Sequence, residues 1–192
     1  MSTREAILDS ARSLIQRRGT NGMSYDDISR QVGIRKASIH YHFPTKNDLL
    51  AELVEGYTDV FLESVAEHTR DAENGAAQLA GFFEVFAATL EGSNGCAVCL
   101  CGMMASEVGS LNDDSVDGVR EFFRKSIETL AGILDVGVED GSLRLAEGLS
   151  HQDAADLIFS SLEGGLLSAR LEGGVPRFRR LTSSFLAMLK AP

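Results

Sequence analysis

The 192-residue chain contains only three prolines and three cysteines, and these scarcities restrict the fold and the chemistry. With so few prolines, and with no β-branched runs of alternating polarity, we expect helices throughout the chain. The cysteines are odd in number and close together, which argues against a disulfide framework and fits a reducing compartment. A Gly-rich phosphate loop, an HExxH motif and a GxSxG motif are absent, so the common nucleotide, metalloprotease and serine hydrolase sites are not indicated.

Long apolar runs are missing as well. The longest candidate, Cys96–Ala105, is far shorter than the roughly 18 residues that a membrane span requires. The first residues, MSTREAILDSAR, carry charges where a secretory signal would need its apolar stretch. We therefore expect a cytoplasmic protein that does not contact a membrane.

Positive charge is scarce overall but unevenly distributed. The chain has 18 Lys and Arg residues and 28 Asp and Glu residues. The resulting net charge of -10 argues against a nucleic-acid partner, whose phosphates are negative. Residues 1–46, however, carry eight cations against four acids and thus +4, which leaves -14 for residues 47–192. This division predicts two domains, 1–46 and 47–192, of which only the first suits an anionic polymer.

Helical periodicity and capping residues predict an all-α chain of about nine helices. The first helix carries an apolar face from Ile7 to Ile15 and ends at Gly19, and a short helix runs from Ser24 to Gly33. The other helices are expected at 36–43, 46 to about 73, 76–91, 96–110, 113–140, 150–172 and 175–190.

Residues 24–43 have the pattern of a helix-turn-helix. Ser24 is a good N-cap, Gly33 allows the tight turn, and apolar residues such as Ile28 and Ile39 would lock the two helices together. The second helix then presents cations, hydroxyls and an aromatic ring to the outside, as reading a DNA major groove requires. These outward residues are Arg35, Lys36, Ser38, Tyr41 and His42. The alternative is a plain helical hairpin within a bundle.

The stretch from about Thr3 to Leu50 strongly resembles the TetR family of bacterial transcriptional regulators. The resemblance rests on motifs in family order and spacing: Asp27-Ile28-Ser29, Val32-Gly33-Ile34, Lys36-Ala37-Ser38-Ile39, Tyr41-His42-Phe43 and Lys46-Asn47-Asp48-Leu49-Leu50. Two positions depart from the family pattern. Arg35 stands where a small capping residue is common and adds a donor for phosphate or guanine, and His40 stands where a tyrosine is usual.

The resemblance implies a three-helix DNA-binding domain followed by a helical ligand-binding and dimerisation domain. A homodimer would insert two recognition helices into successive major grooves of a palindromic operator. In such proteins the residue at Lys46 holds a phosphate. The residues implied at the double-stranded DNA are Ser24, Arg35, Lys36, Ala37, Ser38, His40, Tyr41, His42 and Lys46.

The resemblance also implies where the second domain dimerises and where it binds an inducer. The last two helices would pair with their mates through Leu157, Leu162, Leu166, Phe178, Leu181 and Phe185, and Gly164-Gly165 would allow close approach. An apolar or electrophilic small molecule would lie among Phe82, Phe83, Phe86, Leu90, Cys99, Met103, Phe122, Phe123 and Ile127. Packing within the chain's own core is the alternative for both sets.

The three cysteines allow several interpretations. On one regular helix Cys96, Cys99 and Cys101 cannot converge on a metal ion, and Cys96 and Cys99 lie too far apart for a disulfide. A reactive sensor thiol is possible, above all at Cys96, which is expected in the first turn of a helix, where the dipole lowers a thiol pKa. Inert burial is the alternative.

Taken together, the sequence predicts a one-component repressor that leaves DNA when a ligand or a thiol modification shifts the second domain. The helix from Lys46 to about Glu73 is the expected lever. A constitutive DNA-binding protein and a thiol enzyme are the alternatives. The enzyme lacks support, because neither His68 nor His151, the histidines outside the first domain, lies near a recognisable acid partner or nucleophile motif in the sequence. No catalytic residue, metal or cofactor is predicted.

Overall fold

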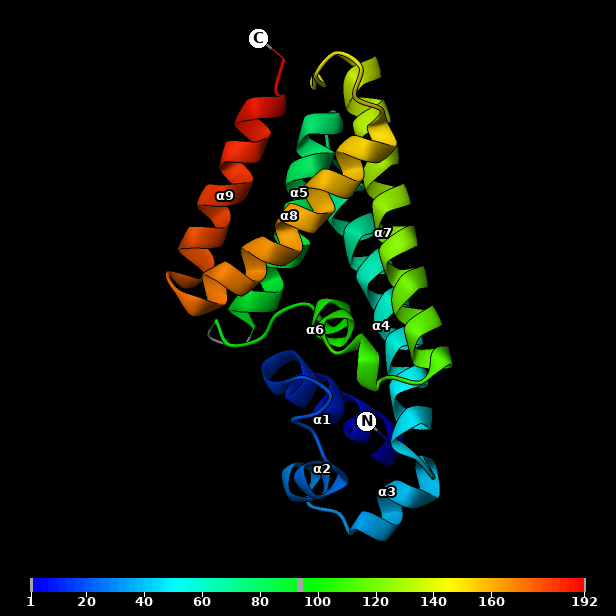
Figure 1. Ribbon diagram of the computed structural model, residues 1–192. Helices are drawn as coiled ribbons and strands as arrows, with labels where there is room; N and C mark the ends of the chain where they lie inside the picture. Colours follow the sequence, from blue (N-terminus) through cyan, green and yellow to red (C-terminus); the bar gives the residue numbers. More distant parts are fainter. Residues whose placement is uncertain (1, 93–94, 192) are drawn as a thin grey trace. The chain divides into compact units, whose positions relative to one another are not determined.

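The computed structural model describes residues 2–92 and 95–191, and this part of the chain is helical (Figure 1). It contains no strand beyond an isolated bridge between Leu143 and Lys190, so the predicted all-α fold is confirmed. The elements are α1 (Thr3–Arg18), α2 (Tyr25–Val32), α3 (Lys36–His42), α4 (Lys46–Thr69), α5 (Gly75–Glu91), α6 (Leu100–Ser106), the 3-10 helix η1 (Val108–Ser110), α7 (Asp113–Glu139), α8 (His151–Leu171) and α9 (Gly174–Leu189).

Short-range signals account for the ends of the first helices. The Ser24 hydroxyl accepts the N–H of Asp27, whose carboxylate accepts the N–H of Ser24, and this capping box begins α2. Gly33 ends α2 in the left-handed region at φ 77°, which costs a residue without a side chain little. Gly19 ends α1 at φ 78°.

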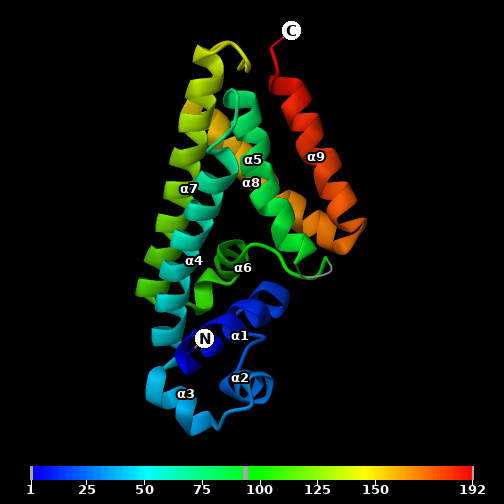
Figure 2. The same ribbon diagram turned by 180° about the vertical axis from the view of Figure 1, so that it is seen from behind.

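One compact unit, here called the head, comprises Met1–Asp59 and Val98–Phe122. It contains α1 to α3, the first part of α4, α6, η1 and the first part of α7. Helix α2 packs on both α1 and α3, and α6 packs on α1 (Figures 1 and 2). The inward faces predicted from periodicity form its core, in which Ile7, Ile15, Ile28, Ile39 and Leu49 are fully buried.

The other compact unit, here called the body, comprises Val60–Ala97 and Phe123–Pro192. Helix α9 packs on α5 and α8, and α5 also packs on α8. A salt bridge joins Arg179 of α9 to Glu84 of α5 at 2.8 Å. Phe82, Phe86, Phe159 and Phe178 are fully or almost fully buried there.

The two compact units do not coincide with the two domains predicted from the distribution of charge. The head takes in residues beyond 46, and both α4 and α7 continue from one unit into the other. The predicted boundary between 46 and 47 separates residues expected to bind DNA from the rest of the chain. Compactness does not test DNA binding, so this boundary stays a prediction.

The helix expected at 96–110 is wrong in its first four residues and after Ser106, where α6 ends and η1 follows. Residues 96–99 are not helical, and α6 begins only at Leu100. The Val98 N–H donates to the Gln16 carbonyl of α1 at 3.2 Å, and the Cys99 thiol accepts the N–H of Gly102 as the N-cap of α6. The segment is extended because its backbone bonds to a distant helix and not to its own next turn.

The lengths and hydropathies of the helices show whether any of them could span a membrane. Among residues 2–92 and 95–191, none of the helices combines the length and the apolar character that crossing a membrane requires.

Candidate nucleic-acid interface

Tyr25 holds the end of the recognition helix α3 in place. Its hydroxyl reaches two backbone carbonyls, those of Phe43 at 2.9 Å and Thr45 at 2.6 Å, so it bridges the corner between α3 and α4. Burial and the nearby Asp48 carboxylate raise the pKa of Tyr25 to about 12, so the phenol keeps its proton. Sequence reasoning did not single out Tyr25, because a tyrosine in the first turn of a helix gives no signal of its distant partners.

His40 belongs to the same corner. Its ring packs edge-on against Tyr25, with centroids 4.9 Å apart, and its Nδ1 lies 3.2 Å from the Pro44 carbonyl oxygen. Because a carbonyl only accepts, Nδ1 is the donor in this bond. The predicted DNA contact at His40 stays a prediction, and within the chain the residue supports the orientation of α3.

The outer face of α3 is polar and open, as predicted. Ile39 is fully buried beneath it, whereas the Tyr41 side chain on the opposite side is 84% exposed. The remaining predicted contact residues of α3 divide into exposed Arg35, Lys36 and Ala37 and half-buried Ser38 and His42. This face offers cations, hydroxyls and an aromatic ring to an external ligand, which are the groups that contact phosphates and base edges.

Two predicted DNA contacts, Lys46 and Ser24, are partly engaged within the chain. Lys46 Nζ donates to the carbonyls of Thr20 at 2.5 Å and Met23 at 2.9 Å, which leaves one of its three hydrogens for a phosphate. Burial lowers the pKa of Lys46, and the neighbouring Glu107 carboxylate opposes that shift. The Ser24 hydroxyl is bonded to Asp27. Both DNA contacts stay predictions.

Glu107, which follows α6, is a positioning residue of the head that sequence reasoning missed. Its carboxylate accepts the N–H of Thr20 at 2.6 Å and the N–H of Asn21 at 3.1 Å, and it also bonds the Thr20 hydroxyl. A Cβ at Gly19 would meet this carboxylate, which is the end of a flexible side chain, so the positive φ is the stronger reason for a glycine there. Desolvation raises the Glu107 pKa, but the hydrogen bonds from Thr20 and Asn21 outweigh it and hold the pKa below its usual value.

The residues predicted around the inducer are distributed over both units. Cys99, Met103 and Phe122 belong to the head, whereas Phe82, Phe83, Phe86, Leu90, Phe123 and Ile127 belong to the body. In the body the rings of Phe82 and Phe86 contact each other and Phe61, and Phe159 contacts both Phe86 and Phe123. The predicted inducer site therefore coincides in part with a packed aromatic core, and its existence stays a prediction.

A cavity of about 370 Å³ lies elsewhere in the body, near the start of α5 and the end of α9. Half of its lining residues are alanines, and it contains none of the residues predicted for the inducer. The lining residues are Asn74, Ala76, Ala77, Ala80, Ser142, Leu186, Lys190 and Ala191.

The structure changes which face of α8 and α9 is open to a second copy. Leu162, Leu166 and Phe178 of the predicted interface are fully buried inside the single chain, in which α8 and α9 pack on each other and on α5. Leu181 and Phe185 are half-buried, and Leu157 is exposed as predicted. The other large apolar side chains exposed on these helices are Leu167, Leu171 and Met188.

The two neighbouring glycines of α8 have different surroundings. A Cβ at Gly165 would lie 2.4 Å from Leu181, so this glycine lets α9 of the same chain approach. A Cβ at Gly164 would meet nothing within 4 Å. Only Gly164 is therefore available for the close approach of a second copy.

The cysteines occupy three different environments. Cys96 is exposed in the non-helical segment, so the predicted activation by a helix dipole does not apply to it. Cys99 and Cys101 are buried, and the Cys99 sulfur lies 3.8 Å from the Tyr57 hydroxyl. Within the described residues no group of three or more His, Cys, Asp or Glu side chains is arranged to hold a metal ion.

His151 has an acid partner, contrary to expectation. Its Nδ1 contacts the Asp135 carboxylate, and both side chains are partly exposed on the body. The neighbouring Ser150 hydroxyl is bonded to Asp153 and caps α8. The contact joins α7 to the start of α8, which the Ser150 cap also stabilises.

Comparison with known proteins identifies close relatives of the whole chain. Residues 7–53 match the family described as bacterial regulatory proteins, tetR family. A TetR-family transcriptional regulator from Agrobacterium tumefaciens is 34% identical, with 98% of this chain and 97% of that one aligned at a TM-score of 0.91. A TetR transcriptional regulator from Legionella pneumophila is 32% identical over the same shares, with a TM-score of 0.85. The HTH-type transcriptional repressor DhaR of Mycobacterium sp. (strain GP1) is 23% identical over 188 residues, 97% of this chain and 92% of DhaR.

Proposed function

The chain belongs to the TetR family of bacterial regulatory proteins and is a transcriptional regulator, and from this premise we propose that it represses transcription as a homodimer on a palindromic operator. The observation that carries the proposal is the open outer face of α3, where Arg35, Lys36 and Tyr41 are exposed on a helix whose other side is anchored by Ile39. Repression agrees with the name of the relative DhaR, and no catalysis is part of the proposal.

Dimerisation is proposed through the outward sides of α8 and α9. Leu157, Leu167 and Leu171 recur at helical spacing along α8, and Gly164 lies among them with open space above it. On α9 the Met188 side chain is also exposed. Apolar residues that remain open in one chain favour contact with a second copy, and a two-fold dimer matches the symmetry of a palindrome.

The signal is proposed to be an apolar or electrophilic small molecule that binds the body. Support comes from the aromatic side chains around Phe86 and from Ser126, whose buried hydroxyl has no hydrogen-bond partner among the described residues. A ligand that hydrogen-bonds to this hydroxyl and packs against these rings would gain affinity from both contacts. Modification of the exposed Cys96 is the second proposed signal.

Release from DNA requires that the signal favour a conformation that binds DNA poorly, since equal affinity for both states shifts nothing. Helix α4 is one proposed lever, because it begins at Lys46 in the head and continues into the body. The Glu107 carboxylate supports a second route, since it ties the segment after α6 to the loop between α1 and α2. A shift of α6 would pull on this loop and on the Lys46 contacts with it.

Selection of genomic DNA fragments by the purified full chain tests the proposal. We expect enrichment of a few fragments that share an inverted repeat, and the genes beside them would indicate the chemical class of the signal. A variant in which Arg35, Lys36 and Tyr41 are all replaced by Ala is the control and should enrich none. If the unmodified chain also enriches no fragment, the proposed function is wrong.

A further inference from the structure

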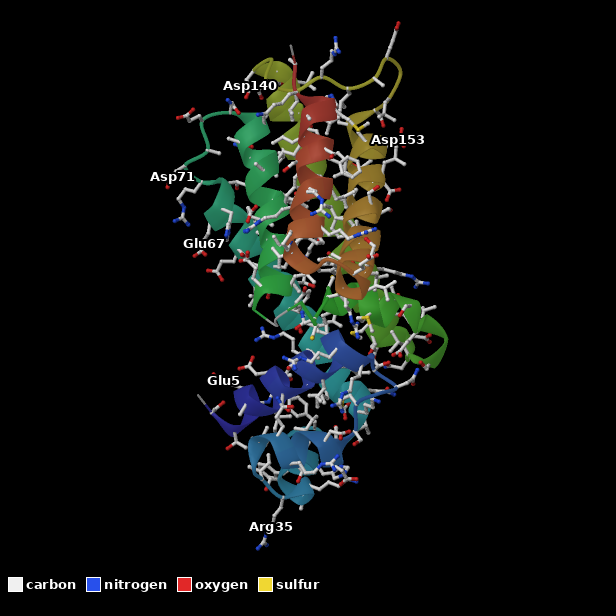
Figure 3. All side chains as sticks on the ribbon, turned by 90° about the vertical axis from the view of Figure 1, so that its left-hand side faces the viewer. Glu5, Arg35, Glu67, Asp71, Asp140 and Asp153 are labelled. Atoms are coloured by element: carbon white, nitrogen blue, oxygen red, sulfur yellow. The ribbon has the colours of Figure 1, made fainter. Side chains whose placement is uncertain are left out.

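Arg35 is an exposed cation at the start of the recognition helix. It occupies the N-cap position of α3 but forms no side-chain capping bond, so it does not stabilise the helix as a smaller polar residue would. Its side chain makes no hydrogen bond or ion pair with the described residues, and in Figure 3 it extends away from the helices of the head. No contact among residues 2–92 and 95–191 accounts for an arginine at this position.

Lys36, the next residue, is held by an acid. Its Nζ lies 3.0 Å from the carboxylate of Asp26 in the first turn of α2. The pair is neutral as a unit, so a phosphate that Lys36 contacts also meets the Asp26 carboxylate, which offsets the charge of Lys36. Asp26 would in turn repel the phosphates if Lys36 left it.

The two cations also differ in what they can recognise. A guanidinium is a planar fork that donates two parallel hydrogen bonds to O6 and N7 of a guanine, whereas an ammonium is a point charge. In helix-turn-helix proteins the first residues of the recognition helix meet base edges. Arg35 combines this position, this chemistry and a side chain without a polar partner among the described residues.

We infer that Arg35 reads a guanine in each operator half-site, while Asp26 holds Lys36 in an ion pair that limits its contact with phosphate. This inference rests on the proposed function. It assigns sequence preference to Arg35, one of the two residues that depart from the family pattern, and it assigns to Asp26 the role of reducing sequence-independent affinity. Asp26 is a positioning residue, since it acts through Lys36.

Selection from a randomised duplex library tests the first part. The unmodified chain should enrich sites with a guanine at one position of each half-site. Arg35→Ala should lower the preference for that guanine by about 5- to 150-fold, the range expected for one lost bidentate contact. Arg35→Lys, the matched control, should keep the charge and the salt dependence but lose most of the preference. Lys36→Ala should leave the base preference unchanged.

The salt dependence of operator binding tests the second part. The slope of log affinity against log salt changes by about 0.9 for each phosphate contact. Asp26→Asn frees Lys36 in both subunits of a dimer, so the slope should become steeper by up to about 1.8 and binding to unrelated DNA should strengthen. The double variant Asp26→Asn/Lys36→Ala should lose this gain. Thermal melting followed by circular dichroism verifies that each variant is folded.

The possible failures are distinguishable. A guanine preference that survives Arg35→Ala, or that is lost with Lys36→Ala, overturns the assignment to Arg35. A slope that Asp26→Asn leaves unchanged overturns the role of the ion pair. If the unmodified chain enriches no sequence at all, the proposed function fails and this inference fails with it.

Discussion

The Glu107 carboxylate accepts the backbone N–H of Thr20 at 2.6 Å, although 87 residues separate the two in the sequence. The same carboxylate accepts the N–H of Asn21, and Lys46 donates to the Thr20 carbonyl from another side. The loop between α1 and α2 is thus held at its N–H groups by an acid and at its carbonyls by a base. Its conformation depends on both charges.

Replacing Glu107 by Gln should lower the free energy of unfolding by about 1–2 kcal/mol, because charge-assisted hydrogen bonds become neutral ones. The Glu107 pKa is lowered in the folded chain, so its stabilising contribution is complete above the ordinary pKa of about 4.5 and is lost as the pH falls through the lowered value. Urea unfolding at several pH values should therefore show weaker acid dependence in Glu107→Gln. Glu55→Gln, at an exposed position of α4, is the control. An acid dependence equal to that of the unmodified chain would contradict this role of Glu107.

Replacing Gly75 by Ala should destabilise the body by about 1–3 kcal/mol. A Cβ at Gly75 would lie 2.2 Å from the backbone nitrogen and Cα of Gly137, and backbone atoms cannot move aside as the end of a side chain can. Gly132→Ala is the matched control, since a Cβ there meets nothing within 4 Å. In the interior of α7 that change should stabilise by roughly 0.5–1 kcal/mol. Thermal or urea unfolding measures both changes, and similar effects of the two would refute the close contact.

Replacing Leu167 by Glu should convert a dimer into a monomer at micromolar concentration, as measured by sedimentation. The side chain is 53% exposed on α8, and a charge buried without a partner at an interface is costly. Val60→Glu, at an exposed apolar position of α4, should leave the dimer intact. If the unmodified chain is already a monomer, or if Leu167→Glu stays a dimer, the proposed interface is incorrect.

A thiol reagent should label one cysteine of the native chain quickly and all three after denaturation. Cys96 is exposed, whereas Cys99 and Cys101 are buried. Cys96→Ser should remove the fast reaction and, if oxidants or electrophiles release the protein from DNA through this thiol, should also remove that response. A response retained in full by Cys96→Ser would end the assignment of Cys96 as the sensor. A fast reaction at a second thiol of the native chain would contradict the burial.

Much of the candidate DNA-reading surface could be predicted because its signals are local. Ser24 and Asp27 form a capping box within one turn, and Gly33 ends α2 in a conformation that suits glycine. The burial of Ile28 and Ile39 follows from helical spacing alone. These features depend on residues that are close together in the sequence, so the sequence alone predicts them.

The open face of α8, through which we propose dimerisation, could not be predicted in the same way. Leu157, Leu162, Leu166 and Leu167 all lie at apolar positions of α8, and periodicity does not say which side α5 and α9 of the same chain will cover. The structure buries Leu162 and Leu166 and leaves Leu157 and Leu167 exposed. The helix predicted to begin at Cys96 failed for a related reason, since Val98 bonds to Gln16 and not to its own next turn.

The sequence by itself therefore determined the helical fold, the helix-turn-helix and the basic character of residues 1–46. Tertiary structure decided which cations of this region already have a partner within the chain. Lys36 forms an ion pair with Asp26, and Lys46 donates to carbonyls of the loop after α1. The Arg35 side chain forms no ion pair or hydrogen bond with the described residues. The physical reason is range. Caps, turns and periodicity act within a few residues, whereas an ion pair or a packed face depends on groups that only the folded chain brings together.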